Sequence, residues 1–148
     1  MEISIVIPAY NEVDRIENSL IEINKYCKKK FKKYEIIVVD DGSNDDTVTI
    51  AKRYGARVLK NELNMGKGYS VRKGILEAKY DLVLFTDSDL ATPINELDKF
   101  LKTIKEYDIV IASRNLKESQ IKVKQPKYRI MLGKLFPFIV RMFLLHGF

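Results

Sequence analysis

Acidic side chains occur in two clusters, each directly after an apolar run of the sequence. Asp40 and Asp41 form the first cluster, and Asp87 and Asp89 flank Ser88 in the second. Because alternate residues of an extended chain point to the same side, Asp87 and Asp89 can share one face. Neighbouring carboxylates repel each other unless a cation lies between them, and Mg²⁺ or Mn²⁺ prefers oxygen ligands. The spacing therefore predicts a divalent-cation site, which is chemistry that stabilises a phosphate leaving group.

Strands and helices are expected to alternate along the chain that positions these acids. Strands are expected at residues 2–7, 34–39, 56–59, 81–86 and 108–112, and helices at residues 12–26, 44–54, 66–79 and 96–105. Such alternation is typical of an α/β domain with a mostly parallel sheet and helices on both faces. Ligands of such sheets bind at the carboxyl ends of the strands, where residues 8–12 (PAYNE) and both acidic clusters fall. The alternative is that each aspartate is only a turn residue or a helix cap, which three polar clusters at three strand ends argue against.

Three further features are expected at helix ends. Ser43 or Asn44 should cap the second helix, and the basic run at residues 28–33 should connect the first helix to the second strand. The segment Gly66-Lys67-Gly68 opens a helix, where backbone N–H groups and the helix dipole favour an anion. It is not a Walker A motif, because glycine follows Gly-Lys. Lys67 could face a phosphate, or it could be a surface charge.

Four segments together resemble one known family. They are residues 6–12 (VIPAYNE), 35–47 (EIIVVDDGSNDDT), 64–68 (NMGKG) and 85–93 (FTDSDLATP), in the family's order and at its spacing. The chain resembles glycosyltransferase family 2, whose nucleotide-sugar-binding domain has the Rossmann-like GT-A fold. Within that family, the dolichyl-phosphate glucose synthases are the most similar, with the mannose synthases as near relatives. The resemblance covers residues 1–115, which are expected to be the donor-binding core.

The resemblance also implies roles for individual residues. Those expected around the base and ribose of a nucleoside diphosphate sugar are Pro8, Ala9, Tyr10, Glu12, Asp40, Asp41 and Gly42. Asp87 and Ser88 would face the ribose and diphosphate, and Lys67 the diphosphate. Asp89 would bind Mg²⁺ or Mn²⁺. Arg114 would bind phosphate through two donors, so the expected catalytic residues are Asp87, Asp89 and Arg114.

The implied activity is inverting transfer of a hexose to a polyprenyl (dolichyl) phosphate, with glucose and UDP-glucose favoured. Mannose synthases usually have a glutamine metal ligand where this chain has Ala91, which argues against mannose. The acceptor phosphate is already ionised near neutral pH and needs little help from a general base. Three alternatives stay open: GDP-mannose as the donor, a polysaccharide as the acceptor, and a donor-binding domain without transfer. The last follows from the family's acceptor-side motif, which is expected beyond Phe148.

Other functional classes lack their signatures in this sequence. Sugar nucleotidyltransferases have a Gly-rich loop and an arginine after the first strand, where this chain has Pro8-Ala9-Tyr10. A nicotinamide dehydrogenase would need Gly-x-Gly-x-x-Gly there. Nucleic-acid binding rests on charge alone, so no nucleic-acid partner is expected. Cys27 and His146 are isolated and expected to be structural.

The excess positive charge lies near the end of the chain. The net charge is +6, and residues 114–148 contain eight Lys or Arg and one acid. Within residues 126–148 the basic side chains share one narrow helical face, and apolar ones cover the rest. No apolar run there approaches the ~20 residues that span a bilayer, so no transmembrane segment is expected. Residues 116–148 are expected to be a basic amphipathic helical segment on the acceptor side, peripheral on the cytoplasmic surface of a membrane. The alternative is a helix packed on its own domain.

Replacing both Leu135 and Phe138 with glutamate is expected to weaken binding to anionic vesicles, because charge on the apolar face opposes its burial in the membrane interface. Vesicle co-sedimentation of the wild type and the variant measures the change. Unchanged co-sedimentation would favour the packed helix.

Overall fold

The computed structural model describes residues 1–113, 133, 135 and 140. The elements in chain order are β1 (Glu2–Ala9), α1 (Val13–Lys30), β2 (Lys33–Asp40), α2 (Thr47–Arg53), β3 (Arg57–Lys60), α3 (Lys67–Leu76), β4 (Val83–Phe85), the 3-10 turn η1 (Ile94–Glu96) and α4 (Leu97–Thr103). The chain divides into two compact units, Met1–Asp108 and Ile109–Phe148. The different roles expected for residues 1–115 and 116–148 stay a prediction.

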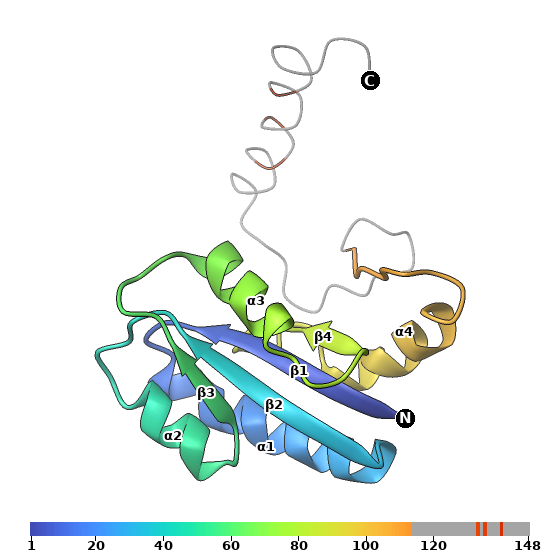
Figure 1. The fold of residues 1–148 in the computed structure, drawn as a ribbon, viewed down its shortest axis with the longest axis horizontal. Coiled ribbons are helices and arrows are strands. Elements are labelled where there is room, and N and C mark those ends of the chain that lie inside the picture. The colour runs from blue at the N-terminus through green and yellow to red at the C-terminus, as the bar shows by residue number, and fades with distance from the viewer. Residues whose placement is uncertain (114–132, 134, 136–139, 141–148) are drawn as a thin grey trace. The chain divides into compact units, whose positions relative to one another are not determined.

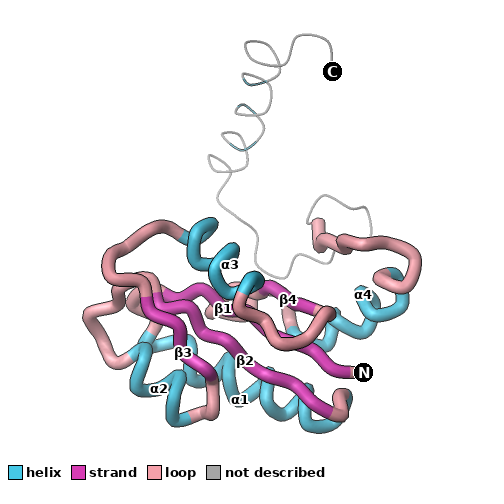
Figure 2. Tube along the Cα trace, viewed as in Figure 1, coloured by secondary structure: helices cyan, strands magenta, loops and turns pink. Residues whose placement is uncertain are grey.

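The four strands form one parallel sheet in the order β3-β2-β1-β4 (Figures 1 and 2). The longest ladder joins β1 to β2, from Glu2 opposite Lys33 to Ala9 opposite Asp40. Its other neighbour, β4, pairs with β1 only from Ser4 to Val6. The predicted α/β class with a parallel sheet is confirmed.

Alternate residues of the central strands supply two apolar layers, as the two-residue period of a strand requires. In the larger layer, the isoleucines of β1 pack with α1, α2 and α4; its members include Ile3, Ile5, Ile7, Ile16, Leu20, Ile23, Ile50 and Leu101. The smaller layer contains Val6, Ile37 and Val39, on the face that α3 covers (Figure 1). Helices therefore lie on both faces of the sheet, as expected. Cys27 belongs to the larger layer, and burial raises the pKa of its thiol to about 12.

The fifth predicted strand, at residues 108–112, is wrong. These residues have irregular backbone, and the side chains of Ile109 and Ile111 are 80% and 79% exposed. An apolar alternating sequence becomes a strand only when a ladder partner is available. Among the described residues, β4 pairs with β1 alone.

Three details at element ends also differ from expectation. Lys28 to Lys30 form the last turn of α1, so the basic run is not simply a connection. The N-cap of α2 is Asp46, in place of Ser43 or Asn44. The strand β1 continues through Pro8 to Ala9, past its predicted end at residue 7. The carbonyl of Val6 faces β4. Because alternate residues of a strand direct their backbone groups to the same neighbour, Pro8 faces the same side as Val6. Because β4 ends at Phe85, the missing N–H of Pro8 costs no ladder hydrogen bond.

The amphipathic helix expected at residues 126–148 falls mostly outside the described residues. Gly133, Leu135 and Val140 are described there, and each has helical backbone. Within the described part of the chain, every helix is too short or too polar to cross a bilayer.

Gly74 allows α3 to approach the sheet closely. A Cβ atom at Gly74 would lie 2.3 Å from Val6 Cγ1 and 2.9 Å from Val39 Cγ2, and both distances require displacement. Gly74→Ala is therefore expected to lower the free energy of unfolding by about 1–3 kcal/mol, although alanine favours helices.

The matched control is Gly68→Ala in the first turn of the same helix, where a Cβ atom would meet no described atom within 4 Å. This change should leave stability equal or raise it by up to about 1 kcal/mol. Urea unfolding followed by circular dichroism measures both, and equal stabilities would contradict the close packing.

Candidate functional site

The carboxyl ends of β1, β2 and β4 lie at one edge of the sheet (Figure 1). The ladders place Ala9 opposite Asp40 and Val6 opposite Phe85. The three polar segments that follow these strands therefore start from the same edge, which is where ligands of parallel sheets bind. The topology brings together the loops that the sequence singled out.

Hydrogen bonds join the loop after β1 to the loop after β2. The backbone N–H of Asn11 donates to Ser43 Oγ at 2.9 Å, and the N–H of Asn44 donates to Asn11 Oδ1 at 2.9 Å. Asn11 has φ 52°, a left-handed conformation that asparagine tolerates better than most residues. Asn11 was not among the predicted site residues. Its position between Tyr10 and Glu12 was the available signal.

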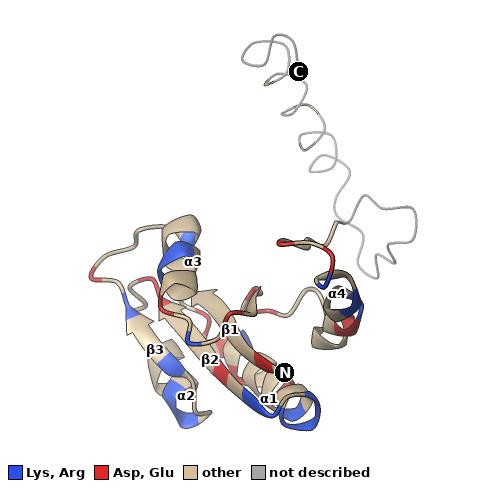
Figure 3. Cartoon of the chain, turned by 45° about the vertical axis from the view of Figure 1, so that its right-hand side comes forward, with Lys and Arg blue, Asp and Glu red and all other residues tan. Residues whose placement is uncertain are grey.

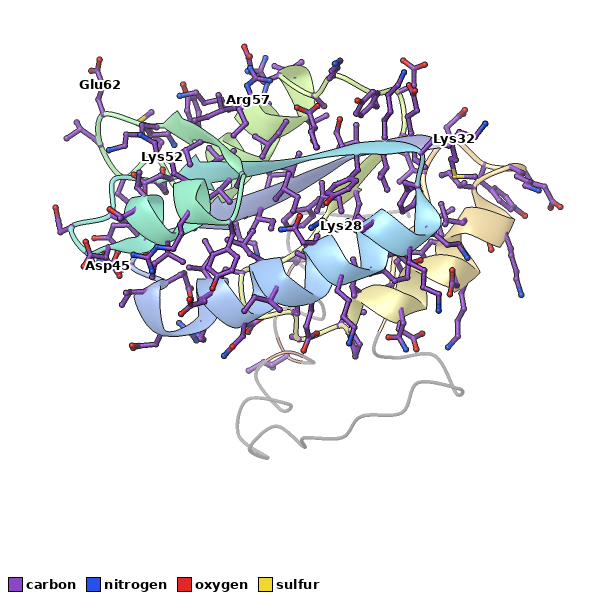
Figure 4. The ribbon with its side chains drawn as sticks, turned by 90° about the horizontal axis from the view of Figure 1, so that it is seen from below. Lys28, Lys32, Asp45, Lys52, Arg57 and Glu62 are labelled. Atoms are coloured by element: carbon purple, nitrogen blue, oxygen red, sulfur yellow. The ribbon has the colours of Figure 1, made fainter. Side chains whose placement is uncertain are left out.

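Asp45, which is labelled in Figure 4, joins the N-terminus of α1 to the N-terminus of α2. Its carboxylate accepts hydrogen bonds from the N–H of Val13 at 3.2 Å and of Thr47 at 3.0 Å. The hydroxyl of Thr47 accepts from the N–H of Glu12 at 2.8 Å. Burial alone would raise the pKa of Asp45, but the hydrogen bonds from Thr47 and Val13 outweigh it, and the pKa falls below its usual 3.8. Both residues were missing from the predicted site, and they position its loops.

The residues predicted around the base and ribose differ in their access to a ligand. Pro8 and Ala9 are buried as the end of β1, whereas the side chain of Tyr10 is 45% exposed at the rim. The carboxylate of Glu12 lies 2.8 Å from Arg15 Nε and has a buried oxygen, Oε2, with poor hydrogen-bond geometry. Tyr10 therefore offers an accessible aromatic side chain in this segment.

Asp40 and Asp41 are both buried, yet their carboxylates have different partners. Asp40 Oδ1 accepts from the N–H of Ser43 at 3.2 Å, and its Oδ2 accepts no hydrogen bond from the described residues. Both oxygens of Asp41 accept hydrogen bonds from the segment between β3 and α3, including one of 2.8 Å from the N–H of Gly66. Asp40 therefore keeps an acceptor for a ligand, and Asp41 is satisfied within the protein.

Lys67 and Asp87 form an ion pair between α3 and the loop after β4. Lys67 Nζ lies 2.6 Å from Asp87 Oδ1 and 5.5 Å from the centre of the Phe85 ring. Both charged side chains are about half exposed, so the pair contributes at most ~1 kcal/mol to stability. Lys67 is therefore more than an isolated surface charge, because it faces one of the predicted acids.

The loop from Asp87 to Leu90 is held to the body of the domain by its backbone. The carbonyl of Ser88 accepts a hydrogen bond of 2.6 Å from Ser19 Oγ in α1, and Ser88 is buried. Leu90 has φ 45°. Asp89 is exposed, and its Oδ1 accepts from the N–H of Ala91 at 3.0 Å. Asp89 therefore offers a solvent-facing carboxylate beside the anchored Ser88.

The acids do not gather into a complete metal site by themselves. No three His, Cys, Asp or Glu side chains within the described residues are placed to hold a metal ion. Hydrogen bonds relieve the charge of Asp41, and Lys67 relieves that of Asp87, so repulsion does not demand a cation as the sequence suggested. Asp87 and Asp89 still fit Mg²⁺ or Mn²⁺, because both are accessible oxygen donors and a bound diphosphate would supply further oxygens. Arg114, the predicted phosphate-binding residue, lies outside the described residues.

A parallel sheet with polar loops at its carboxyl edge defines a ligand-binding α/β domain. The sequence profile described as "Glycosyl transferase family 2" matches residues 4–146. The chain belongs to this family, and the resemblance noted in the sequence is confirmed.

Several relatives over most of the chain carry the name dolichyl-phosphate beta-glucosyltransferase. The chain is 38% identical to dolichyl-phosphate beta-glucosyltransferase ALG5D of Trichomonas vaginalis, over 88% of this chain and 45% of the relative. It is 36% identical to the Drosophila melanogaster dolichyl-phosphate beta-glucosyltransferase, over 97% of this chain and 50% of the relative. The chain thus spans about half the length of these relatives.

Solved structures share the fold. A mannosyltransferase from Pyrobaculum calidifontis, in complex with GDP-Man and Mn²⁺, has a TM-score of 0.62 at 24% identity, over 72% of this chain and 33% of that one. Glucosyl-3-phosphoglycerate synthase from Mycobacterium tuberculosis, in complex with Mn²⁺, UDP and glucosyl-3-phosphoglycerate, has a TM-score of 0.57 at 33% identity, over 70% of this chain and 39% of that one. The expected GT-A fold is confirmed, and both neighbours are complexes with Mn²⁺.

Asp45→Asn is expected to lower the free energy of unfolding by about 1–2 kcal/mol near neutral pH, because it weakens hydrogen bonds at two helix N-termini. The folded-state pKa of Asp45 is depressed, so its stabilising effect is present above its usual pKa of 3.8 and is lost as pH falls through the lower value. The difference between wild type and variant should therefore shrink in acid.

Asp46→Asn is the matched control, because Asp46 makes no side-chain capping hydrogen bond. Urea unfolding at neutral and acidic pH measures both variants. A loss in Asp45→Asn that is no larger than in Asp46→Asn would contradict the role of Asp45.

Proposed function

We propose that this chain provides the donor-binding part of an inverting glycosyltransferase that moves glucose from UDP-glucose to a polyprenyl (dolichyl) phosphate. The observation that carries the proposal is the Lys67–Asp87 pair after β4, two residues from the exposed Asp89. At the same edge of the sheet β2 ends in Asp40, whose Oδ2 accepts no hydrogen bond from the described residues. A cation and an acid that face each other at a ligand-binding edge suit a metal–diphosphate group. The names of the relatives support the sugar and the lipid phosphate.

Donor recognition begins at the loops after β1 and β2. The exposed ring of Tyr10 would stack on or flank the base, above the buried floor of Pro8 and Ala9. Asp40 Oδ2, which accepts no hydrogen bond within the described part of the chain, would accept one from the base or ribose. Glu12 and Gly42 complete this end of the site.

The diphosphate would lie between α3 and the loop after β4. Lys67, the first residue of α3, would reach the phosphate oxygens from its position beside Asp87. Further Lys and Arg residues (blue in Figure 3) lie along α3. The N-terminus of a helix also favours an anion. Asp89 would hold Mg²⁺ or Mn²⁺, with Asp87 facing the ribose and diphosphate. The metal's contribution is to neutralise charge on the departing UDP.

The acceptor side of the proposal rests on residues 114–148. Their eight basic side chains suit a phosphate and the anionic cytoplasmic surface of a membrane. Arg114 would bind the acceptor or donor phosphate. The lipid phosphate would attack the anomeric carbon in line with departing UDP and invert it. The competing proposal is donor binding without transfer.

Calorimetry with UDP-glucose and GDP-mannose, with and without Mn²⁺, tests the donor site. We expect UDP-glucose to bind more tightly than GDP-mannose and Mn²⁺ to increase its affinity by about tenfold or more, since the cation screens the diphosphate. Asp89→Ala should remove the effect of Mn²⁺.

Asp81→Ala is the matched control, because Asp81 is an exposed acid at the amino end of β4. It should bind as the wild type does. If Mn²⁺ increases affinity in Asp89→Ala as much as in the wild type, Asp89 is not the metal ligand. If GDP-mannose binds more tightly than UDP-glucose, mannose replaces glucose as the proposed sugar.

A further inference from the structure

The segment between β3 and α3 is held by the buried carboxylate of Asp41. Asp41 Oδ1 accepts hydrogen bonds from Asn61 Nδ2 at 2.7 Å and from the N–H of Met65 at 2.9 Å. Its Oδ2 accepts from the N–H of Gly66 at 2.8 Å. These three donors come from residues at least twenty positions along the chain. Asp41 is therefore the junction between the end of β2 and the start of α3.

Asn61 extends this junction into α3. Its Nδ2 also donates to Ser70 Oγ at 2.9 Å, and its Oδ1 accepts from Lys73 Nζ at 3.0 Å. Asn61, Ser70 and Asp41 are all buried. Buried polar groups with satisfied partners hold one arrangement, because each lost partner is costly. The first two turns of α3 are thereby fixed relative to β2.

The backbone at both ends of the segment supports the same arrangement. Gly66, the N-cap of α3, has φ 88°, which a residue with a side chain rarely adopts. Gly42, directly after Asp41, has φ 84°, and a Cβ atom there would lie 3.3 Å from the backbone N of Asn64. The turn after β2 and the segment before α3 therefore lie against each other.

We propose that Asp41 is a positioning residue for the donor's diphosphate: it holds residues 61–66 so that Lys67 faces Asp87. Lys67 follows the Gly66 amide that Asp41 binds, and its Nζ lies 2.6 Å from Asp87. This assignment replaces direct nucleotide binding by Asp41, since both of its oxygens are used within the protein. It rests on the proposed function for the identity of the ligand. Preorganised charges avoid the cost of ordering them when the ligand binds.

The environment of Asp41 explains why an aspartate suits this position. Burial would raise its pKa, but hydrogen bonds from Asn61, Met65 and Gly66 lower it below the usual 3.8. The ionised form accepts at both oxygens, whereas an asparagine would present an N–H₂ group to one of the donors. Asp41→Asn keeps the size of the side chain and removes this match.

The test compares UDP with uridine, which has the base and ribose but no diphosphate. Asp41→Asn should weaken UDP binding in the presence of Mn²⁺ by about tenfold, the order of one charge-assisted hydrogen bond. Uridine binding, followed by NMR titration, should be unchanged. A parallel loss for uridine would overturn the proposal, because it would place Asp41 on the nucleoside.

A double-mutant cycle with Lys67→Met identifies the group that Asp41 acts through. In the Lys67→Met background, Asp41→Asn should cause little further loss of UDP affinity. If the double variant loses UDP affinity by the product of the two single losses, Asp41 does not act through Lys67. A merely structural role would lower the melting temperature without this dependence on Lys67.

Amide hydrogen exchange followed by NMR tests the Asp41 hydrogen bonds without a ligand. Asp41→Asn should speed hydrogen exchange at the N–H groups of Met65 and Gly66, and leave that of Phe31 in the α1–β2 connection unchanged. If wild type binds neither UDP nor uridine, the proposed function fails while the exchange still reports on the junction. If Asp41→Asn does not fold, Asn61→Ala, which removes one donor and keeps the carboxylate, should show the same pattern at smaller size. Wild-type exchange at Gly66 in the variant that folds would overturn the proposal.

Discussion

The parallel ladder between β1 and β2 is the constraint on which the site depends. It runs without interruption from Glu2 opposite Lys33 to Ala9 opposite Asp40, and it lies at the centre of the sheet. A shift of one residue would exchange the two faces of β2 and move each of its buried side chains into the wrong apolar layer. With the register fixed, the loops after both strands start level with each other, and hydrogen bonds through Asn11 and Asp45 can join them. β4 then adds the loop of Asp87 and Asp89 on the other side of β1.

Two adjacent aspartates serve different purposes because a strand places neighbours on opposite sides. Asp40 ends β2 with one oxygen unused by the described residues, whereas Asp41 turns to the β3–α3 segment and uses both. A ligand can satisfy the first. The second stabilises the protein around the site. The roles of neighbouring acidic residues in a short motif therefore follow from the hydrogen-bond partners of each carboxylate.

Three of the acids near the carboxyl edge have strong partners within the protein. Backbone and side-chain donors neutralise Asp41 and Asp45, and Lys67 pairs with Asp87. In the proposed reaction Asp89 would hold the metal ion, and the donor diphosphate would supply further oxygen ligands. Metal and donor would then bind together, as Mn²⁺ and UDP do in the glucosyl-3-phosphoglycerate synthase complex.

The local pattern of the sequence determined the elements and their class. Apolar runs, helical periodicity and the Gly66 helix start are properties of short segments, so β1 to β4, α1 to α4 and the polar clusters at strand ends could be predicted. The family followed from motifs in the same segments. These inferences needed no knowledge of which distant residues meet.

Only the tertiary structure decided the partners. Three hydrogen bonds join residues far apart in sequence: the N–H of Gly66 donates to Asp41, the N–H of Val13 donates to Asp45, and Ser19 Oγ donates to the carbonyl of Ser88. The strand expected at residues 108–112 failed for the same reason, since its apolar alternation is local but a ladder requires a neighbour. Side-chain type and spacing indicate what a residue can bind. The fold determines whether its donors and acceptors are already used by other groups of the protein, as those of Asp41 are.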